Sequence, residues 1–293
     1  MSEARRHDVV VAGFDARLEQ RNGRLKSNNF SELSSSKSTL EMRPVGPSQP
    51  HGRIPNTPGA VSLISFILGG ICFLSLSTFF SKLVVSGVSH EGFVNLEGWW
   101  WATPQLGFFL AAWSIFHWAE FVVTAGWNRD NCSVDSFLLD NGAMYHVAHV
   151  TALTEYLLSL YFAPSWKAFS YVSVVGVVMT IVGQGLRSTA MIHASTNFSH
   201  HLAFKKAERH RLVKDGIYAW FRHPSYAGFF YWALGTQLVL QNPISFILYS
   251  ILLWRFFRQR TRVEEASLIR FFGDDVAFVM ALLFAIVSKR IEK

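Results

Sequence analysis

The feature that most constrains the fold is an uncharged stretch, residues 224–254, which contains no Asp, Glu, Lys or Arg. About 20 apolar residues suffice to cross a bilayer, so this run is long enough to do so with residues to spare. Asn242-Pro243 interrupts it, and Pro disfavours helical geometry in the residue before it. The sequence therefore predicts a tight helical hairpin that enters and leaves the membrane on one side. Residues 210–226 and 255–265 would then return to the same polar face.

Composition supports a membrane protein. Half of the residues are hydrophobic, 15% are aromatic and only 16% are charged, whereas soluble proteins usually have about 25% charged residues. Lys and Arg gather at the edges of apolar runs, as the positive-inside rule describes. The net charge of +7 is therefore explained without nucleic acid, and no nucleic-acid partner is expected. Cys72 and Cys132 are too few and too far apart for a disulfide framework or a zinc ribbon.

Two domains are predicted. Residues 1–58 are rich in Ser and Pro, and few of them are able to form a core, so they are expected to be a disordered, cytosolic N-terminal tail. The first apolar run begins far from Met1, so no signal peptide is apparent. Residues 59–293 are expected to form one integral membrane domain.

This domain is predicted to be all-α, a polytopic integral membrane helical bundle with about six transmembrane helices, including the hairpin near the C-terminal end. The expected spans are residues 61–81, 98–119, about 138–162, 168–186 with a continuation toward His193, 226–240 and 244–254. Loop charge places both termini and the two polar strips in the cytosol. The apolar segment 276–288 is too short to be assigned to a span.

Several polar groups fall in or near these spans, where they are candidates for function by default: His117, Glu120, His146, His149 and Glu155. No HExxH motif occurs, as a zinc protease would require. Hydrogen bonding between helices, or the lining of a substrate cavity, is favoured over metal binding, and no metal is expected. Gly183-Gln184-Gly185 follows an apolar helix and is interpreted as a helix-packing motif rather than a nucleotide loop.

Two strings carry a resemblance to a known family: LVKDGIYAWFRHPSYAGFFYWALGTQLVLQNP and WRFFRQRTRVEEASLIRFFGDD. They closely resemble the isoprenylcysteine carboxyl methyltransferases. SIFHWAEFVVTA, DSFLLDNGAMYHVAHV and GQGLRSTAMIHASTNFSHH fit the same family in the same order. The resemblance covers roughly residues 111–275, is most specific at RHPSY and RTRVEE, and is closest to the fungal layout. After Asp275 the chain departs from the tyrosines and the Gly-Ile-Pro-Phe-like tail typical of the family.

The resemblance implies a multi-pass enzyme of the endoplasmic reticulum membrane with its active site facing the cytosol. Such an enzyme uses S-adenosyl-L-methionine to methylate the α-carboxylate of a C-terminal S-prenylcysteine on Ras-type and other CaaX-processed proteins. The prenyl chain would enter sideways from the membrane lipid. Residues 59–293 would then be an integral membrane methyltransferase domain.

The cofactor is expected to lie along the strip before and at the start of the hairpin. His210, Leu212 and Val213 would frame the adenine, Gly216 permits a sharp turn, and Tyr218 would stack on or hydrogen-bond the nucleoside. The N–H groups that begin the next helix favour the methionine carboxylate. The full predicted cofactor set is His210, Arg211, Leu212, Val213, Tyr218, His223, Pro224, Ser225, Tyr226 and Glu264.

The predicted catalytic residues are Arg260 and Glu264. They are four residues apart and hence on one helix face. Arg260 would bind the substrate carboxylate, and Glu264 would bind the cofactor's amino or ribose groups. Glu265 is expected to point elsewhere. Because a carboxylate is already ionised at neutral pH, methyl transfer to it requires positioning rather than a general base.

Two other functions remain open on the residues alone. One is a membrane phospholipid N-methyltransferase, since its cytosolic cofactor site would look similar. The other is a non-catalytic sterol-binding or lipid-binding membrane protein.

Overall fold

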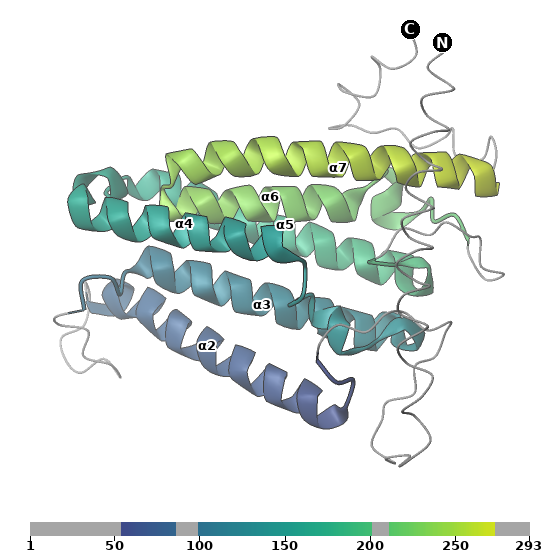
Figure 1. Cartoon of the computed structure of the whole chain (residues 1–293), viewed down its shortest axis with the longest axis horizontal. Helices are drawn as coiled ribbons and strands as arrows, with labels where there is room; N and C mark the ends of the chain where they lie inside the picture. The colour runs from purple at the N-terminus through teal and green to yellow at the C-terminus, as the bar shows by residue number, and fades with distance from the viewer. Residues whose placement is uncertain (1–53, 86–98, 201–210, 273–293) are drawn as a thin grey trace, which may run out of the picture. The chain divides into compact units, whose positions relative to one another are not determined.

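The computed structural model describes residues 54–85, 99–200 and 211–272, all within the unit Met42–Lys293. These residues form α-helices connected in several places by 3-10 helices, with no strand among them (Figure 1). The α-helices are α2 (Pro58–Val85), α3 (Pro104–Trp127), α4 (Ala143–Phe162), α5 (Ser170–Ala194), α6 (Pro224–Leu240) and α7 (Pro243–Phe272). The predicted all-α bundle is confirmed. The predicted tail lies almost wholly outside the described residues, as do segment 276–288 and His210.

Three of the described helices are long and apolar enough to cross a membrane: Pro58–Phe80, Pro104–Trp127 and Ser170–Asn197. Several large apolar side chains of α2 are exposed, including Phe66 at 80%, as expected of a helix that faces lipid. α6 has 17 residues, somewhat fewer than the usual span of about 20. The membrane character is thus confirmed, and the number of six spans stays a prediction.

The predicted hairpin is present. α6 ends at Leu240 and is capped by Gln241, which adopts a left-handed conformation with φ of 52°. Pro243 begins α7 as its first residue. α6 and α7 then run back along each other (Figure 1). Asn242 connects the turn to α4, since its Nδ2 donates to the carbonyl of Ala152 at 2.8 Å.

The predicted bounds of the second and third helices are wrong. The second helix begins at Pro104, not at residue 98, because Thr103 caps it by accepting from Leu106 N at 3.2 Å. It also continues past residue 119 to Trp127. The third helix begins at Ala143 rather than near residue 138, because Leu138 is left-handed (φ 54°) and Gly142 has a positive φ of 83° in an extended conformation. Neither conformation continues a right-handed helix.

The last predicted span, 244–254, is the first part of a longer helix, α7, which runs for 30 residues to Phe272. The helix expected to carry Arg260 and Glu264 is continuous with that span. Residues 255–272 are mostly good helix formers with no Gly or Pro, so nothing in them breaks the helix. At 1.5 Å per residue α7 is about 45 Å long, against about 30 Å for the hydrocarbon core. Its C-terminal part, with Arg260 and Glu264, therefore extends into the aqueous boundary as helix.

The turn of the hairpin is fixed by Lys167 and Glu155. Lys167 Nζ donates to the carbonyls of Leu240 and Gln241 at 3.0 and 2.9 Å and to Asn242 Oδ1 at 2.9 Å. Burial lowers the pKa of Lys167 to about 8, and the negative charge of Glu155 opposes that shift. Glu155 accepts from the first free N–H groups of α7, those of residues 244 and 245, at 2.9 and 2.6 Å. Both ends of the turn are therefore capped by charges of the appropriate sign.

α5 and α6 touch at paired glycines. A Cβ on Gly183 would lie 2.7 Å from the carbonyl oxygen of Gly228, and a Cβ on Gly228 would lie 2.7 Å from that of Gly183. Gly176 and Gly235 form a second pair of the same kind, at 2.7 and 2.9 Å. Small residues let membrane helices approach to backbone contact. These contacts set how deep α6, and hence its first turn, sits against α5.

The hairpin predicts a labelling pattern. In a Cys72→Ser/Cys132→Ser background, His223→Cys and Arg260→Cys should both react with a membrane-impermeant thiol reagent from the same side, because both positions lie at the open end. Trp166→Cys is the control, since residue 166 is 63% exposed beside the turn and should react only from the opposite side. Labelling of positions 223 and 260 from different sides would refute the hairpin in the membrane.

Candidate active site

Arg260 of α7 and Tyr226 of α6 meet at the open end of the hairpin. Arg260 Nε donates to Tyr226 Oη at 2.8 Å, and the guanidinium carbon lies 5.5 Å from the centre of the same ring. Tyr226 Oη donates in turn to Glu264 Oε2 at 2.5 Å. Arg260 and Glu264 therefore share a helix face, as their spacing predicted. The phenol connects this cation and anion into one hydrogen-bonded chain.

His223 extends this chain from the residue before α6. Its ring stacks on Tyr226 with centroids 5.5 Å apart and an interplanar angle of 4°. Its Nδ1 lies 3.7 Å from Glu264 Oε2, and its Nε2 lies 3.2 Å from Glu265 Oε1. One imidazole thus faces both carboxylates of α7.

Glu265 does not point away from this strip, so that prediction is wrong. Besides its contact with His223, Glu265 Oε1 accepts from Arg222 Nη1 at 3.3 Å. The two nitrogens of His223 reach neighbouring positions on α7, which is why helical spacing alone misplaced Glu265. The hydrogen bond from His223, aided by the charge of Arg222, lowers the pKa of the Glu265 carboxyl, although burial acts in the opposite direction.

Pro224 and Ser225 form the buried first turn of α6. Ser225 Oγ accepts from Arg187 Nη1 at 3.0 Å, and the Ser225 carbonyl lies 3.4 Å from the same nitrogen. The Ser225 hydroxyl is thus engaged with the protein itself. The predicted cofactor contacts of Pro224 and Ser225 stay predictions.

The strip before α6 is held against α5. Gly216 has φ of 58° and begins the 3-10 helix η5 (Gly216–Ala219), where a Cβ would lie 2.9 Å from the His193 ring. The sharp turn predicted at Gly216 is confirmed, since a left-handed φ favours Gly. Tyr218 Oη donates to the carbonyl of Ala190 in α5 at 3.3 Å, and burial raises the pKa of this phenol. Arg211 N donates to Asn197 Oδ1 at 2.8 Å.

Of the remaining predicted cofactor residues, those after residue 210 are described by the structure. Leu212 and Val213 are half-buried beside Arg211, whose side chain is exposed. His210 lies outside the described residues. The cofactor roles of Arg211, Leu212, Val213 and Tyr218 stay predictions.

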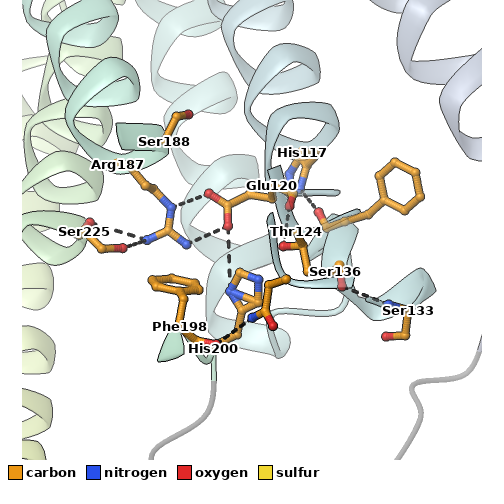
Figure 2. Close-up of polar contacts among 12 residues, drawn as sticks. His117, Glu120, Thr124, Ser133, Ser136, Arg187, Ser188, Phe198, His200 and Ser225 are labelled. Atoms are coloured by element: carbon orange, nitrogen blue, oxygen red, sulfur yellow. Dashed lines mark hydrogen bonds and ion pairs between the residues drawn. The ribbon is translucent and has the colours of Figure 1, made fainter. Parts of the chain in front are cut away.

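A buried ion pair lies beneath this strip (Figure 2). Glu120 of α3 accepts from Arg187 Nε and, at 2.9 Å, from Arg187 Nη2 of α5. Glu120 Oε2 also lies 3.8 Å from His200 Nδ1. Arg187 is held between two aromatic rings, with its guanidinium carbon 5.5 Å from the centre of Phe116 and 5.4 Å from that of Phe229. The side chains of Glu120 and Arg187 are only 1% and 8% exposed.

Among the other intramembrane polar groups, His117 hydrogen-bonds between elements and His149 within α4. His117 Nδ1 donates to the carbonyl of Phe137 at 2.6 Å, because a carbonyl only accepts, and His117 Nε2 then accepts from Tyr145 Oη at 2.8 Å. His149 Nδ1 lies 2.9 Å from the carbonyl of Tyr145. The predicted bonding between elements is confirmed for His117. Across the described ranges, no three His, Cys, Asp or Glu side chains are grouped closely enough to hold a metal ion.

Gly183-Gln184-Gly185 lies within α5, not in a loop. Gly183 packs against α6, while a Cβ on Gly185 would meet nothing within 4 Å. The helix-packing interpretation is therefore confirmed for Gly183.

Sequence reasoning missed the support behind the strip. Arg187, Asn197 and His200 were not selected from the sequence as site residues. Glu120 and Arg187 are isolated opposite charges within two long apolar helices, and this is the signal that could have found the pair.

Comparison with known proteins agrees with the strings noted in the sequence. Residues 175–270 match the model of the isoprenylcysteine carboxyl methyltransferase family. The Xenopus laevis protein-S-isoprenylcysteine O-methyltransferase is 37% identical over 225 residues, which cover 74% of this chain and 78% of that protein. This chain belongs to the isoprenylcysteine carboxyl methyltransferase family. The Saccharomyces cerevisiae protein-S-isoprenylcysteine O-methyltransferase is 45% identical over 183 residues, or 59% of this chain and 77% of the yeast protein.

The similarity extends to a solved structure. The eukaryotic intramembrane Ras methyltransferase superposes with a TM-score of 0.58 at 38% identity, covering 59% of this chain and 62% of that one. The human protein-S-isoprenylcysteine O-methyltransferase is 46% identical over 171 residues, and this chain spans 60% of its length.

Proposed function

We propose that this protein transfers a methyl group from S-adenosyl-L-methionine to the C-terminal carboxylate of an S-prenylated cysteine in CaaX-processed, Ras-type proteins. The observation that carries the proposal is the Arg260–Tyr226–Glu264 chain, which presents a cation and an anion side by side at the membrane boundary. The cation suits the carboxylate of the methyl acceptor, and the anion suits the amino group of the methyl donor. Membership of the family supports the same methyl donor and acceptor.

The residues present suit adenosylmethionine. Glu264, 35% exposed, can accept from an amino or ribose group, and the first turn of α6 favours a carboxylate. When bound, this donor supplies an activated methyl group on a positively charged sulfur.

Positioning explains the reaction without a general base. The substrate carboxylate is already ionised, so one of its oxygens forms the new C–O bond while the C–S bond breaks, and no proton has to move. Arg260 would fix the carboxylate, and Tyr226 would keep Arg260 and Glu264 in register. Alignment of this kind lowers a barrier by up to about 7–11 kcal/mol.

Methylation of a phospholipid amine is the less favoured function. An amine must lose a proton before it can accept a methyl group, and the guanidinium of Arg260 would repel its protonated form. A carboxylate meets neither obstacle. The prenyl chain would lie in the lipid beside the exposed apolar side chains of the bundle.

We place the enzyme in the endoplasmic reticulum membrane with this site facing the cytosol. Arg129, in the 3-10 helix η1 (Arg129–Asn131), lies at the same end as the 3-10 helix η4 (Ser195–Asn197) that follows α5. Arg255, Arg258 and Arg262 are exposed on α7 toward that end. Positive residues mark the cytosolic side.

One assay tests the function. Membranes that contain the protein should convert N-acetyl-S-farnesylcysteine and labelled adenosylmethionine into a base-labile methyl ester. Label confined to lipid would support the phospholipid enzyme instead. If no product forms and adenosylmethionine does not raise the unfolding temperature of the purified protein, a non-catalytic lipid-binding role would replace the proposal.

A further inference from the structure

The carboxylate of Glu120 lies at the centre of a buried polar cluster that connects four elements (Figure 2). Its two oxygens accept from Nε and Nη2 of Arg187, and one also faces the ring of His200. Glu120 is 1% exposed. Glu120 therefore exerts its influence through Arg187 and His200.

The first arm of the cluster ends on the start of α6. Arg187 Nη1 donates to Ser225 Oγ at 3.0 Å, and Ser225 lies between His223 and Tyr226. Because Glu120 fixes the other edge of the guanidinium, the position of Ser225 depends on the carboxylate. A shift of this first turn would move the His223 and Tyr226 rings together.

The second arm ends on α7. His200, whose ring faces Glu120, accepts at its carbonyl from Arg260 Nη2 at 2.5 Å. The same segment is fixed two residues earlier, where Asn128 Nδ2 donates to the carbonyl of Phe198 at 2.8 Å. Glu120 thus contacts both supports of the Arg260–Tyr226 pair, one from each helix of the hairpin.

We propose that Glu120 is a positioning residue for methyl transfer, which holds Tyr226 in register with Arg260 through Arg187–Ser225 on one side and His200 on the other. This inference rests on the proposed function. A buried ion pair by itself is weak evidence for stability, since apolar replacements of similar volume are often neutral or stabilising. Both arms of this pair end on the site, which gives the buried charges a functional reason.

The first test is Glu120→Gln, which keeps the shape and removes the charge. We expect kcat for N-acetyl-S-farnesylcysteine to fall at least about tenfold, while KM for both substrates changes less than about threefold, since misalignment acts on the reacting geometry. Glu155→Gln is the matched control: it removes the charge from a carboxylate that caps α7 at the far end of the hairpin. It should lower the unfolding temperature and leave kcat within about twofold.

The second test is a double-mutant cycle with Tyr226→Phe, which removes the hydroxyl that joins Arg260 to Glu264. If Glu120 acts by aligning that hydroxyl, Glu120→Gln should cost at least about tenfold in kcat in the wild-type background and less than about threefold in the Tyr226→Phe background. Changes at independent sites simply multiply. Equal costs in both backgrounds would therefore overturn the proposal.

A third variant guards against loss of folding. Glu120→Met combined with Arg187→Met replaces the pair with apolar side chains and should recover the unfolding temperature lost in Glu120→Gln. We expect kcat to stay low although stability returns; recovery of kcat with stability would reduce the pair to a structural role. An inactive wild-type protein would overturn the proposed function and this inference together, whereas an active wild type with an unimpaired Glu120→Gln would overturn this inference alone.

Discussion

Replacement of Arg260 by Ala should reduce methylation of N-acetyl-S-farnesylcysteine roughly 100- to 1,000-fold, the usual loss when a charge-stabilising donor is removed from a reacting centre. The guanidinium is held by Tyr226 Oη and the His200 carbonyl. It is thus fixed in place before any substrate arrives. Cofactor binding, measured as the increase in unfolding temperature with adenosylmethionine, should remain nearly intact.

Two further variants sharpen this test. Arg260→Lys should recover only part of the activity, because an ammonium cannot offer the planar fork of a guanidinium. Arg258→Ala, which removes an exposed Arg from the same helix, should leave activity within about twofold. An equal loss of adenosylmethionine binding in Arg260→Ala and Arg260→Lys would place Arg260 among the cofactor contacts instead.

Replacement of Gly183 by Ala should destabilise the protein by about 1–3 kcal/mol, as overpacking does. Its Cβ would meet the backbone nitrogen of Trp232 and the carbonyl oxygen of Gly228, and backbone atoms cannot rotate aside as side chains do. α5 and α6 would separate, and the first turn of α6 would move with them. The measurement is thermal unfolding in detergent, together with methyltransferase activity.

Gly185→Ala is the matched control two residues along the same helix. Nothing lies within 4 Å of a Cβ there, so Ala should raise helix stability by up to about 1 kcal/mol. A nucleotide loop would behave differently: both substitutions would weaken adenosylmethionine binding, and the unfolding temperature without cofactor would change little. That outcome would contradict the helix-packing interpretation of Gly183-Gln184-Gly185.

The strip at the start of the hairpin shows where sequence reasoning was sufficient. Arg260 and Glu264 were placed on one helix face by spacing alone, and Asn242-Pro243 was sufficient to place the turn. Both inferences use local rules, the helical repeat and the geometry of proline. Glu265 shows the limit of such rules, because its partners Arg222 and His223 come from another segment, and helical spacing says nothing about a neighbouring chain.

The cofactor residues show a second limit. The sequence assigned Ser225 to the cofactor because it lies at a helix start, and Tyr218 because it could stack on or hydrogen-bond the nucleoside. The structure gives each of them a partner within the protein, Arg187 for Ser225 and the Ala190 carbonyl for Tyr218, and their cofactor roles stay predictions. A hydroxyl's partner depends on which helices pack together, and residue type does not reveal it.

By itself the sequence determined the membrane class, the hairpin and the two strips at its open end. A long uncharged run has few low-cost environments other than the membrane, and proline breaks a helix wherever that helix packs. Only the tertiary structure decided that Glu120 and Arg187 pair beneath the strip and that Glu265 joins it. It also decided that Lys167 and Glu155 cap the turn. These contacts join residues far apart in the chain. Which of them form depends on the depth and rotation of each helix in the bundle. The glycine contacts between α5 and α6 help to set that depth and rotation.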